Sequence, residues 1–211
     1  MKDLINLYTA PAKFFRSLDT IQKWSYLIPV VMFYGMVLTM ERIDKVYFRA
    51  VMRESGQTTL PDQGWLYWGQ YVGESWFYYW AMVFIFGGIV GGVIVWWVGG
   101  WWYKLRLKWS GIQDPDPKSA RTLYVYSSLV YNLPKVLSVI VISLLFSTYI
   151  EASSGVPTYI HTLLSVFLFW SLQASYQGIV EVYSPQSLLK VKIWFVFLPA
   201  SLYVLSIGLG L

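Results

Sequence analysis

The sequence predicts an all-helical protein that crosses a membrane about five times, as a bundle of transmembrane helices preceded by an amphipathic helix. The chain has 211 residues, of which 56% are hydrophobic and 13% are charged, about half the charged fraction of a soluble domain. The apolar residues fall in five long runs, and a helix needs roughly 20 residues to cross about 30 Å of hydrocarbon. Only helices and closed barrels satisfy the backbone inside a bilayer. The runs lack the alternation of barrel strands, so they predict helices.

The chain divides into a cytoplasmic interfacial segment, residues 1–23, and a five-helix transmembrane domain, residues 24–211. The second run is the longest, and the third is interrupted by polar residues. The spans are expected at about residues 24–40, 75–103, 122–150, 159–180 and 193–211.

Residues 9–23 predict a basic amphipathic helix ahead of the first span. Thr9 is a candidate N-cap, with Pro11 in the first turn, where a missing amide is tolerated. Apolar residues then recur at helical spacing, with cations elsewhere around the helix. We expect the helix to lie in the membrane interface with its aromatic face in lipid. It serves either as an anchor that orients the first span or as a docking surface. Its key residues are Phe14, Phe15, Arg16 and Leu18.

The distribution of Lys and Arg predicts the orientation. Eleven of them fall in the N-terminal segment and in the second and fourth loops, against four in the first loop. Because cytoplasmic loops carry the excess of Lys and Arg, the N-terminus is expected in the cytoplasm and the C-terminus outside. No cleavable signal peptide is expected, since the first apolar run starts late and no small-residue cleavage site follows it.

Four glycines in the second span place small residues on one helix face. Gly87 with Gly91, and Gly88 with Gly92, are each four residues apart. Helices in bilayers associate by close packing, and such a stripe favours contact with another helix. That helix belongs either to this bundle or to a partner or second copy.

Asn132, Pro134 and Lys135 form a polar cluster within the third run. If the helix is continuous from Thr122, Lys135 lies about 18 Å in, near the midplane. If Pro134 breaks the helix, Lys135 reaches the headgroups instead. A lysine at the bilayer centre costs about 2.5–3.5 kcal/mol and marks an ion or substrate pathway. No acidic residue falls inside another expected span to pair with it, which weakens a proton-relay interpretation.

The composition argues against catalysis. There are no cysteines and one histidine, His161, too few to build a zinc site or a Ser-His-Asp triad. Asp114 and Asp116 lie in a proline-rich turn typical of a solvated loop. We therefore expect no enzyme, no catalytic residues, no cofactor and no metal. The +5 charge suits anionic headgroups better than nucleic acid, which we do not expect as a partner.

Three motifs point to a family. The sequence reads APAKFF at residues 10–15, YNLP at residues 131–134, and QGIVEVY at residues 177–183 followed by SLLK at residues 187–190. On these the chain resembles the bacterial branch of the Yip1 family of small integral membrane proteins. The motifs correspond to a proline-then-aromatic helix before the first span, a tyrosine-and-proline break in the third, and a short loop before the last. The resemblance implies five spans, a cytoplasmic N-terminus, a bacterial cytoplasmic (inner) membrane and no catalytic set.

Two functions are expected from these features. The first is a non-enzymatic accessory or adaptor protein that binds or regulates another membrane protein, such as a transporter complex, in contact with membrane lipids. The alternative is a small homo-oligomeric transporter or channel that uses Lys135. Shaping of the membrane by the interfacial helix is a third possibility.

Overall fold

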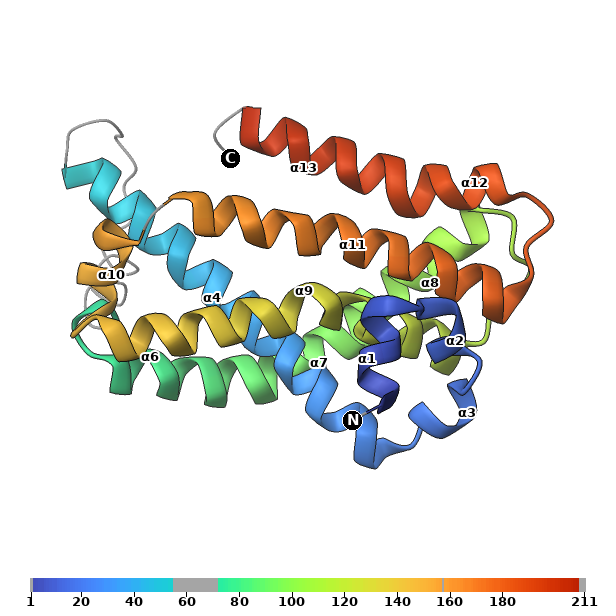
Figure 1. The fold of residues 1–211 in the computed structure, drawn as a ribbon, viewed down its shortest axis with the longest axis horizontal. Coiled ribbons are helices and arrows are strands. Elements are labelled where there is room, and N and C mark those ends of the chain that lie inside the picture. The colour runs from blue at the N-terminus through green and yellow to red at the C-terminus, as the bar shows by residue number, and fades with distance from the viewer. Residues whose placement is uncertain (1, 55–71, 157, 209–211) are drawn as a thin grey trace.

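A computed structural model describes residues 2–54, 72–156 and 158–208 (Figure 1). Within these ranges the protein is all helical, and five helical segments are long and apolar enough to cross a membrane, which confirms the fold class expected from the sequence. Successive spans alternate in direction. The N-terminal elements lie at one end of the bundle, which we call the N-terminal end, and α10 lies at the far end. The five are Trp24–Lys45, Trp76–Trp109, Pro117–Leu145, Leu163–Tyr183 and Leu188–Leu205.

The first span lies in α4 (Trp24–Glu54), which continues well past the expected end at Met40. Glu41 and Asp44, expected in a loop, are therefore helical. Residues 41–54 contain no Gly or Pro, and Glu41 stands four residues before Lys45, a spacing and order that support a helix. The remainder of the expected first loop, residues 55–71, lies outside the described residues.

The second span is a run of consecutive helices that continues beyond the expected end at Tyr103. Ser75 caps its start by accepting a hydrogen bond from the Phe77 amide. At 34 residues it is about 51 Å long and exceeds a hydrocarbon core of about 30 Å. The run consists of α6 (Trp76–Met82), π-helical η1 (Val83–Gly91), α7 (Gly92–Ile94), π-helical η2 (Val95–Gly99) and α8 (Gly100–Trp109).

The third span is the continuous helix α9 (Pro117–Leu145), so of the two alternatives left open at Pro134 the structure has the continuous helix and not the break. Proline removes one intrahelical hydrogen bond, a loss that membrane helices tolerate when neighbouring groups compensate. The helix also ends earlier than the expected Ile150, because Phe146 is extended and Thr148 caps a separate helix, α10 (Tyr149–Gly155).

The fourth and fifth spans lie in α11 (Thr158–Tyr183) and in the run α12 (Leu188–Lys192), η3 (Ile193–Phe197) and α13 (Leu198–Gly208). Residues 177–183, expected in a loop, are helical and belong to α11; the connection is residues 184–187. Only 11% of the apolar window of the fifth span is buried inside the chain, against 28–39% for the others. The fifth span is therefore the least covered one.

The expected single helix over residues 9–23 is wrong. The segment forms α1 (Lys2–Thr9), α2 (Pro11–Phe15) and α3 (Leu18–Ile21). Pro11 starts α2 as expected, but Thr9 ends α1 instead of capping a helix. The break lies at Ala10, which is not helical, because a residue before proline is pushed out of the α region.

The aromatic face of this segment packs on protein. Phe14 and Phe15 are 3% and 1% exposed and belong to the main core, with Leu18 packed against it. A Cβ added to Gly178 of α11 would lie 2.6 Å from the Phe15 ring, so the glycine makes room for it. Arg16 donates to a Glu181 carboxylate oxygen at 2.7 Å. The segment is thus docked on α11 and does not lie in lipid through its phenylalanines.

The glycine stripe packs inside the bundle. A Cβ added to Gly35 of α4 would lie 2.1 Å from the Gly87 carbonyl oxygen, and one on Gly91 would lie 2.9 Å from the Gly35 carbonyl oxygen. Gly88 and Gly92 lie beside α4 as well, facing Met32 and Val31. Of the two alternatives for the stripe, packing within the chain describes Gly87 and Gly91.

Candidate functional site

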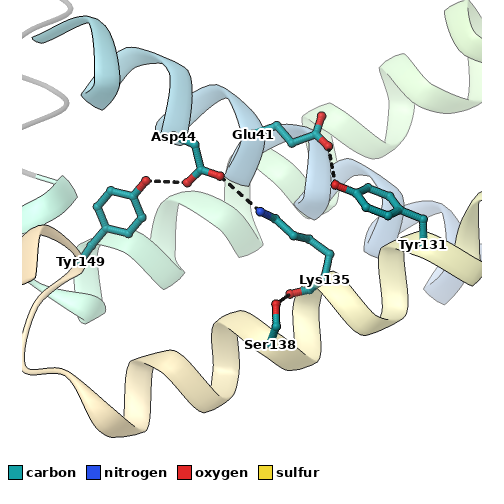
Figure 2. A network of polar contacts seen from close by, with 6 residues as sticks. All are labelled: Glu41, Asp44, Tyr131, Lys135, Ser138 and Tyr149. Carbon is teal, nitrogen blue, oxygen red and sulfur yellow. Dashed lines mark hydrogen bonds and ion pairs between the residues drawn. The ribbon is translucent and has the colours of Figure 1, made fainter. Parts of the chain in front are cut away.

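The polar cluster of the third span faces α4 through Lys135. This lysine is 8% exposed, and its Nζ lies 3.4 Å from Oδ2 of Asp44, whose side chain is 39% exposed (Figure 2). The hydroxyl of Tyr149, at the start of α10, donates to the other Asp44 oxygen. An acidic residue of the first span therefore pairs with Lys135, and the expectation that none would do so is wrong.

A second carboxylate lies three residues before Asp44 on α4. Glu41 accepts a hydrogen bond from the Tyr131 hydroxyl at 3.3 Å and also interacts electrostatically with Lys135. Figure 2 shows both carboxylates pointing from α4 towards α9. One lysine thus faces two carboxylates, each held by a tyrosine hydroxyl. Ionisable groups gathered inside a membrane bundle are typical of ion pathways and proton relays.

The same helix pair carries further polar groups towards the N-terminal end. The Tyr124 hydroxyl of α9 donates to the Tyr34 hydroxyl of α4 at 2.7 Å, and Ser128 also bonds the Tyr34 side chain. Arg106 of α8 interacts electrostatically with both tyrosines and donates to the Trp194 carbonyl oxygen. Glu41 in turn interacts with Tyr34, so the two groups of contacts adjoin one another.

These polar groups follow one face of α9. Tyr124, Ser128, Tyr131 and Lys135 are four, three and four residues apart, the spacing that keeps side chains on one side of a helix. Tyr34, Glu41 and Asp44 do the same on α4, seven and three residues apart. We call this set the polar seam. Its members are Arg106, Tyr34, Tyr124, Ser128, Glu41, Tyr131, Lys135, Asp44 and Tyr149.

The continuity of α9 fixes the depth of Lys135 within the apolar run. At about 1.5 Å per residue it lies about 20 Å from Thr122 and about 15 Å from the helix end at Leu145. It is therefore in the middle part of the span, where a cation needs a counterion. Asp44 supplies it.

Two buried polar atoms have no hydrogen-bond partner among the described residues, and both are next to the seam. The Asn132 amide nitrogen follows Tyr131 directly on α9, in a residue that is 1% exposed. The Tyr79 hydroxyl belongs to a ring stacked on Tyr149, with centroids 5.1 Å apart. A buried donor without a partner costs free energy of folding.

Sequence reasoning identified Lys135 but missed the rest of the seam. The signal was present, since Tyr124, Ser128 and Tyr131 precede Lys135 at helical spacing within an apolar run. The acidic partners were missed because the first span was ended at the last apolar residue, Met40. The side chain of His161 lies outside the described side chains.

A helical membrane bundle with a charged seam between two of its spans defines a class: the chain is a polytopic membrane protein. No protein-family model, curated protein or solved structure matches it. The resemblance to the Yip1 family therefore rests on the three sequence motifs and remains a proposal.

Proposed function

We propose that this protein is a small non-enzymatic transporter that passes protons across the membrane along the polar seam. The observation that supports the proposal is the seam itself, in which a mid-span lysine faces two carboxylates and a series of hydroxyls continues towards Arg106. Ionisable residues inside a membrane are costly and mark ion pathways and proton relays. The seam lies within one chain, so the pathway needs no second copy.

Protons suit the seam better than hydrated ions. The groups are packed side chain to side chain, with the Tyr124–Tyr34 contact at 2.7 Å and the Tyr131–Glu41 contact at 3.3 Å. Adjoining hydrogen-bonded pairs of this kind suit proton transfer without an open pore, whereas an ion would need to displace these contacts.

The test is proton flux into liposomes that contain the purified protein and a pH-sensitive dye, driven by a potassium diffusion potential. Wild-type protein should carry flux above that of empty liposomes, and Glu41→Gln, Lys135→Ala and Tyr131→Phe should reduce it to that background. Arg42→Gln changes an exposed charge beside Glu41 and should leave the flux unchanged. Wild-type flux equal to that of empty liposomes would contradict the proposal and would mean that the polar seam only packs the helices together.

An accessory protein that binds another membrane protein is the second candidate function. It is supported by the fifth span, of which only 11% is buried inside the chain, and by the resemblance to the Yip1 family. The test is purification from the native host in mild detergent, followed by mass spectrometry. A membrane protein recovered in stoichiometric amounts would favour this function, and a particle of this chain alone would favour transport.

We also propose the bacterial cytoplasmic membrane, with the N-terminus in the cytoplasm. The resemblance to the Yip1 family supports this membrane, and the distribution of Lys and Arg supports the orientation. The N-terminal helices and the connections α8–α9 and α11–α12, which carry most of these residues, lie at the same end of the bundle (Figure 1).

A further inference from the structure

An apolar groove lies between α4 and the second span, away from the polar seam. Its volume is about 390 Å³, and nearly all of its surface is apolar. Tryptophans stand around it on both helices. The residues that define it include Trp24, Ile28, Met32, Gly88, Gly92 and Trp97.

The groove exists because two glycines of the stripe lack side chains. A Cβ on Gly88 would first meet the end of the Met32 side chain at 3.3 Å, and one on Gly92 would meet Val31 at 3.4 Å. Ile89 and Val93 flank them and are 60% and 57% exposed. Gly88 and Gly92 are buried beside α4 and form the floor of the groove, whereas Gly87 and Gly91 pack against Gly35.

A cation adjoins the tryptophans of this groove. The Arg121 guanidinium carbon lies 4.4 Å from the ring centroid of Trp97 and 5.6 Å from that of Trp96. Gly100 admits its stem, since a Cβ there would lie 2.3 Å from Arg121 Cγ. Within the described part of the chain, the ion pairs found are formed by Arg16 and Lys135, and none involves Arg121.

We propose that the groove binds an anionic phospholipid of the surrounding membrane, with an acyl chain over Gly88 and Gly92 and the phosphate on Arg121. Charge complementarity selects this occupant. Tryptophans favour the headgroup level, and a guanidinium binds phosphate through paired hydrogen bonds. A guanidinium beside an apolar groove at that level matches a molecule with an anionic head and an apolar tail. Lys23, exposed beside Trp24, adds to the positive charge.

The test is native mass spectrometry of the full-length protein in detergent, with phosphatidylglycerol and phosphatidylcholine of identical acyl chains added in turn. Wild-type protein should retain one phosphatidylglycerol about fivefold more tightly than phosphatidylcholine, the preference expected for one cation at the headgroup level. Arg121→Gln should abolish the preference, because it weakens the binding of phosphatidylglycerol more than that of phosphatidylcholine, whose choline cation offsets the charge of its phosphate. Lys108→Gln, an exposed cation of α8, should keep the preference.

Filling the groove should weaken the binding of both lipids to the same extent. Gly92→Leu places a side chain in the groove, and Val93→Trp fills it from the flank if the leucine variant does not fold. Equal binding of the two lipids by wild-type protein, or a preference that survives Arg121→Gln, would overturn the proposal. So would a photo-crosslinker at Ile89 that captures a protein instead of lipid in native membranes. None of these results depends on proton flux, so the proposal stands or falls apart from the proposed transport.

Discussion

At the scale of single residues, Lys135 and Asp44 form an ion pair between the first and third spans. Removing one member of a buried pair leaves the other uncompensated, which costs more than removing both. Lys135 is 8% exposed, whereas the Asp44 side chain is 39% exposed, so water screens part of the interaction.

We expect Lys135→Met to lower the free energy of unfolding by about 1–3 kcal/mol, below the value for a fully buried pair because Asp44 is half exposed. The double variant Lys135→Met with Asp44→Asn should recover part of the loss. Thermal unfolding in detergent, followed by circular dichroism, measures both. A double variant no more stable than the single one would mean that Glu41, and not Asp44, is the main counterion.

Asp116 gives a prediction about pH. Its carboxylate accepts hydrogen bonds from the amide and hydroxyl of Ser119 at the start of α9. Burial alone would raise the pKa of Asp116, but the hydrogen bonds from Ser119 outweigh it and lower the pKa below its ordinary value. The stabilisation is thus fully present above the ordinary pKa of about 4 and is lost as the pH falls through the lowered one.

Asp116→Ala should cost about 1 kcal/mol at neutral pH, the usual contribution of a helix cap, whereas Asp116→Asn should keep the cap and lose this acid sensitivity. Asp114→Asn, in the same turn, should retain it. Melting temperatures at pH 3 and pH 7 separate the three variants. An Asp116→Asn protein as acid-sensitive as wild type would show that other carboxylates control the acid limit.

At the scale of elements, the contact between α4 and η1 depends on glycine at both surfaces. We expect Gly35→Ala to destabilise the protein by about 1–3 kcal/mol, the usual cost of overpacking, because its Cβ would meet backbone at 2.1 Å. Gly88→Ala should be tolerated, since the nearest atom is the flexible end of Met32 at 3.3 Å. Thermal unfolding of the two variants checks this. Equal stability of the two would mean that the helices move apart without loss.

The elements also show where sequence reasoning succeeds. Apolar length predicted all five spans, because the requirement to cross hydrocarbon acts on each helix separately. It failed at the end of α4, because a helix continues beyond the bilayer wherever its residues favour helix. It failed at residues 9–23 for another reason: Phe14 and Phe15 have the pattern of a lipid-facing helix, but Gly178 provides a protein pocket for Phe15 that no local pattern reveals.

At the scale of the whole molecule, the orientation is testable with few complications because the chain has no cysteine. Gln186→Cys lies in the α11–α12 connection and Ser147→Cys at the far end, before α10. With the N-terminus in the cytoplasm, a membrane-impermeant maleimide added to intact cells should label Ser147→Cys and not Gln186→Cys. The reverse pattern would place the N-terminal end outside.

The arrangement of the spans relative to one another could not be predicted from the sequence, for a physical reason. Lys135 and the glycine stripe indicate that another helix packs against them. The identity of that helix depends on contacts between distant segments of the chain. Gly35 is a single glycine without a stripe of its own, and Asp44 lies among loop-like charges. The role of each residue can be recognised only together with the residue that it contacts on the neighbouring helix.

The separation of Asp44 and Lys135 in the chain has a consequence for biosynthesis. They are 91 residues apart, and a ribosome adds about 5–20 residues per second, so Asp44 exists for roughly 5–18 s before its counterion is made. The ion pair between the first and third spans can therefore form only after the third span has been synthesised, so the first two spans are made in its absence.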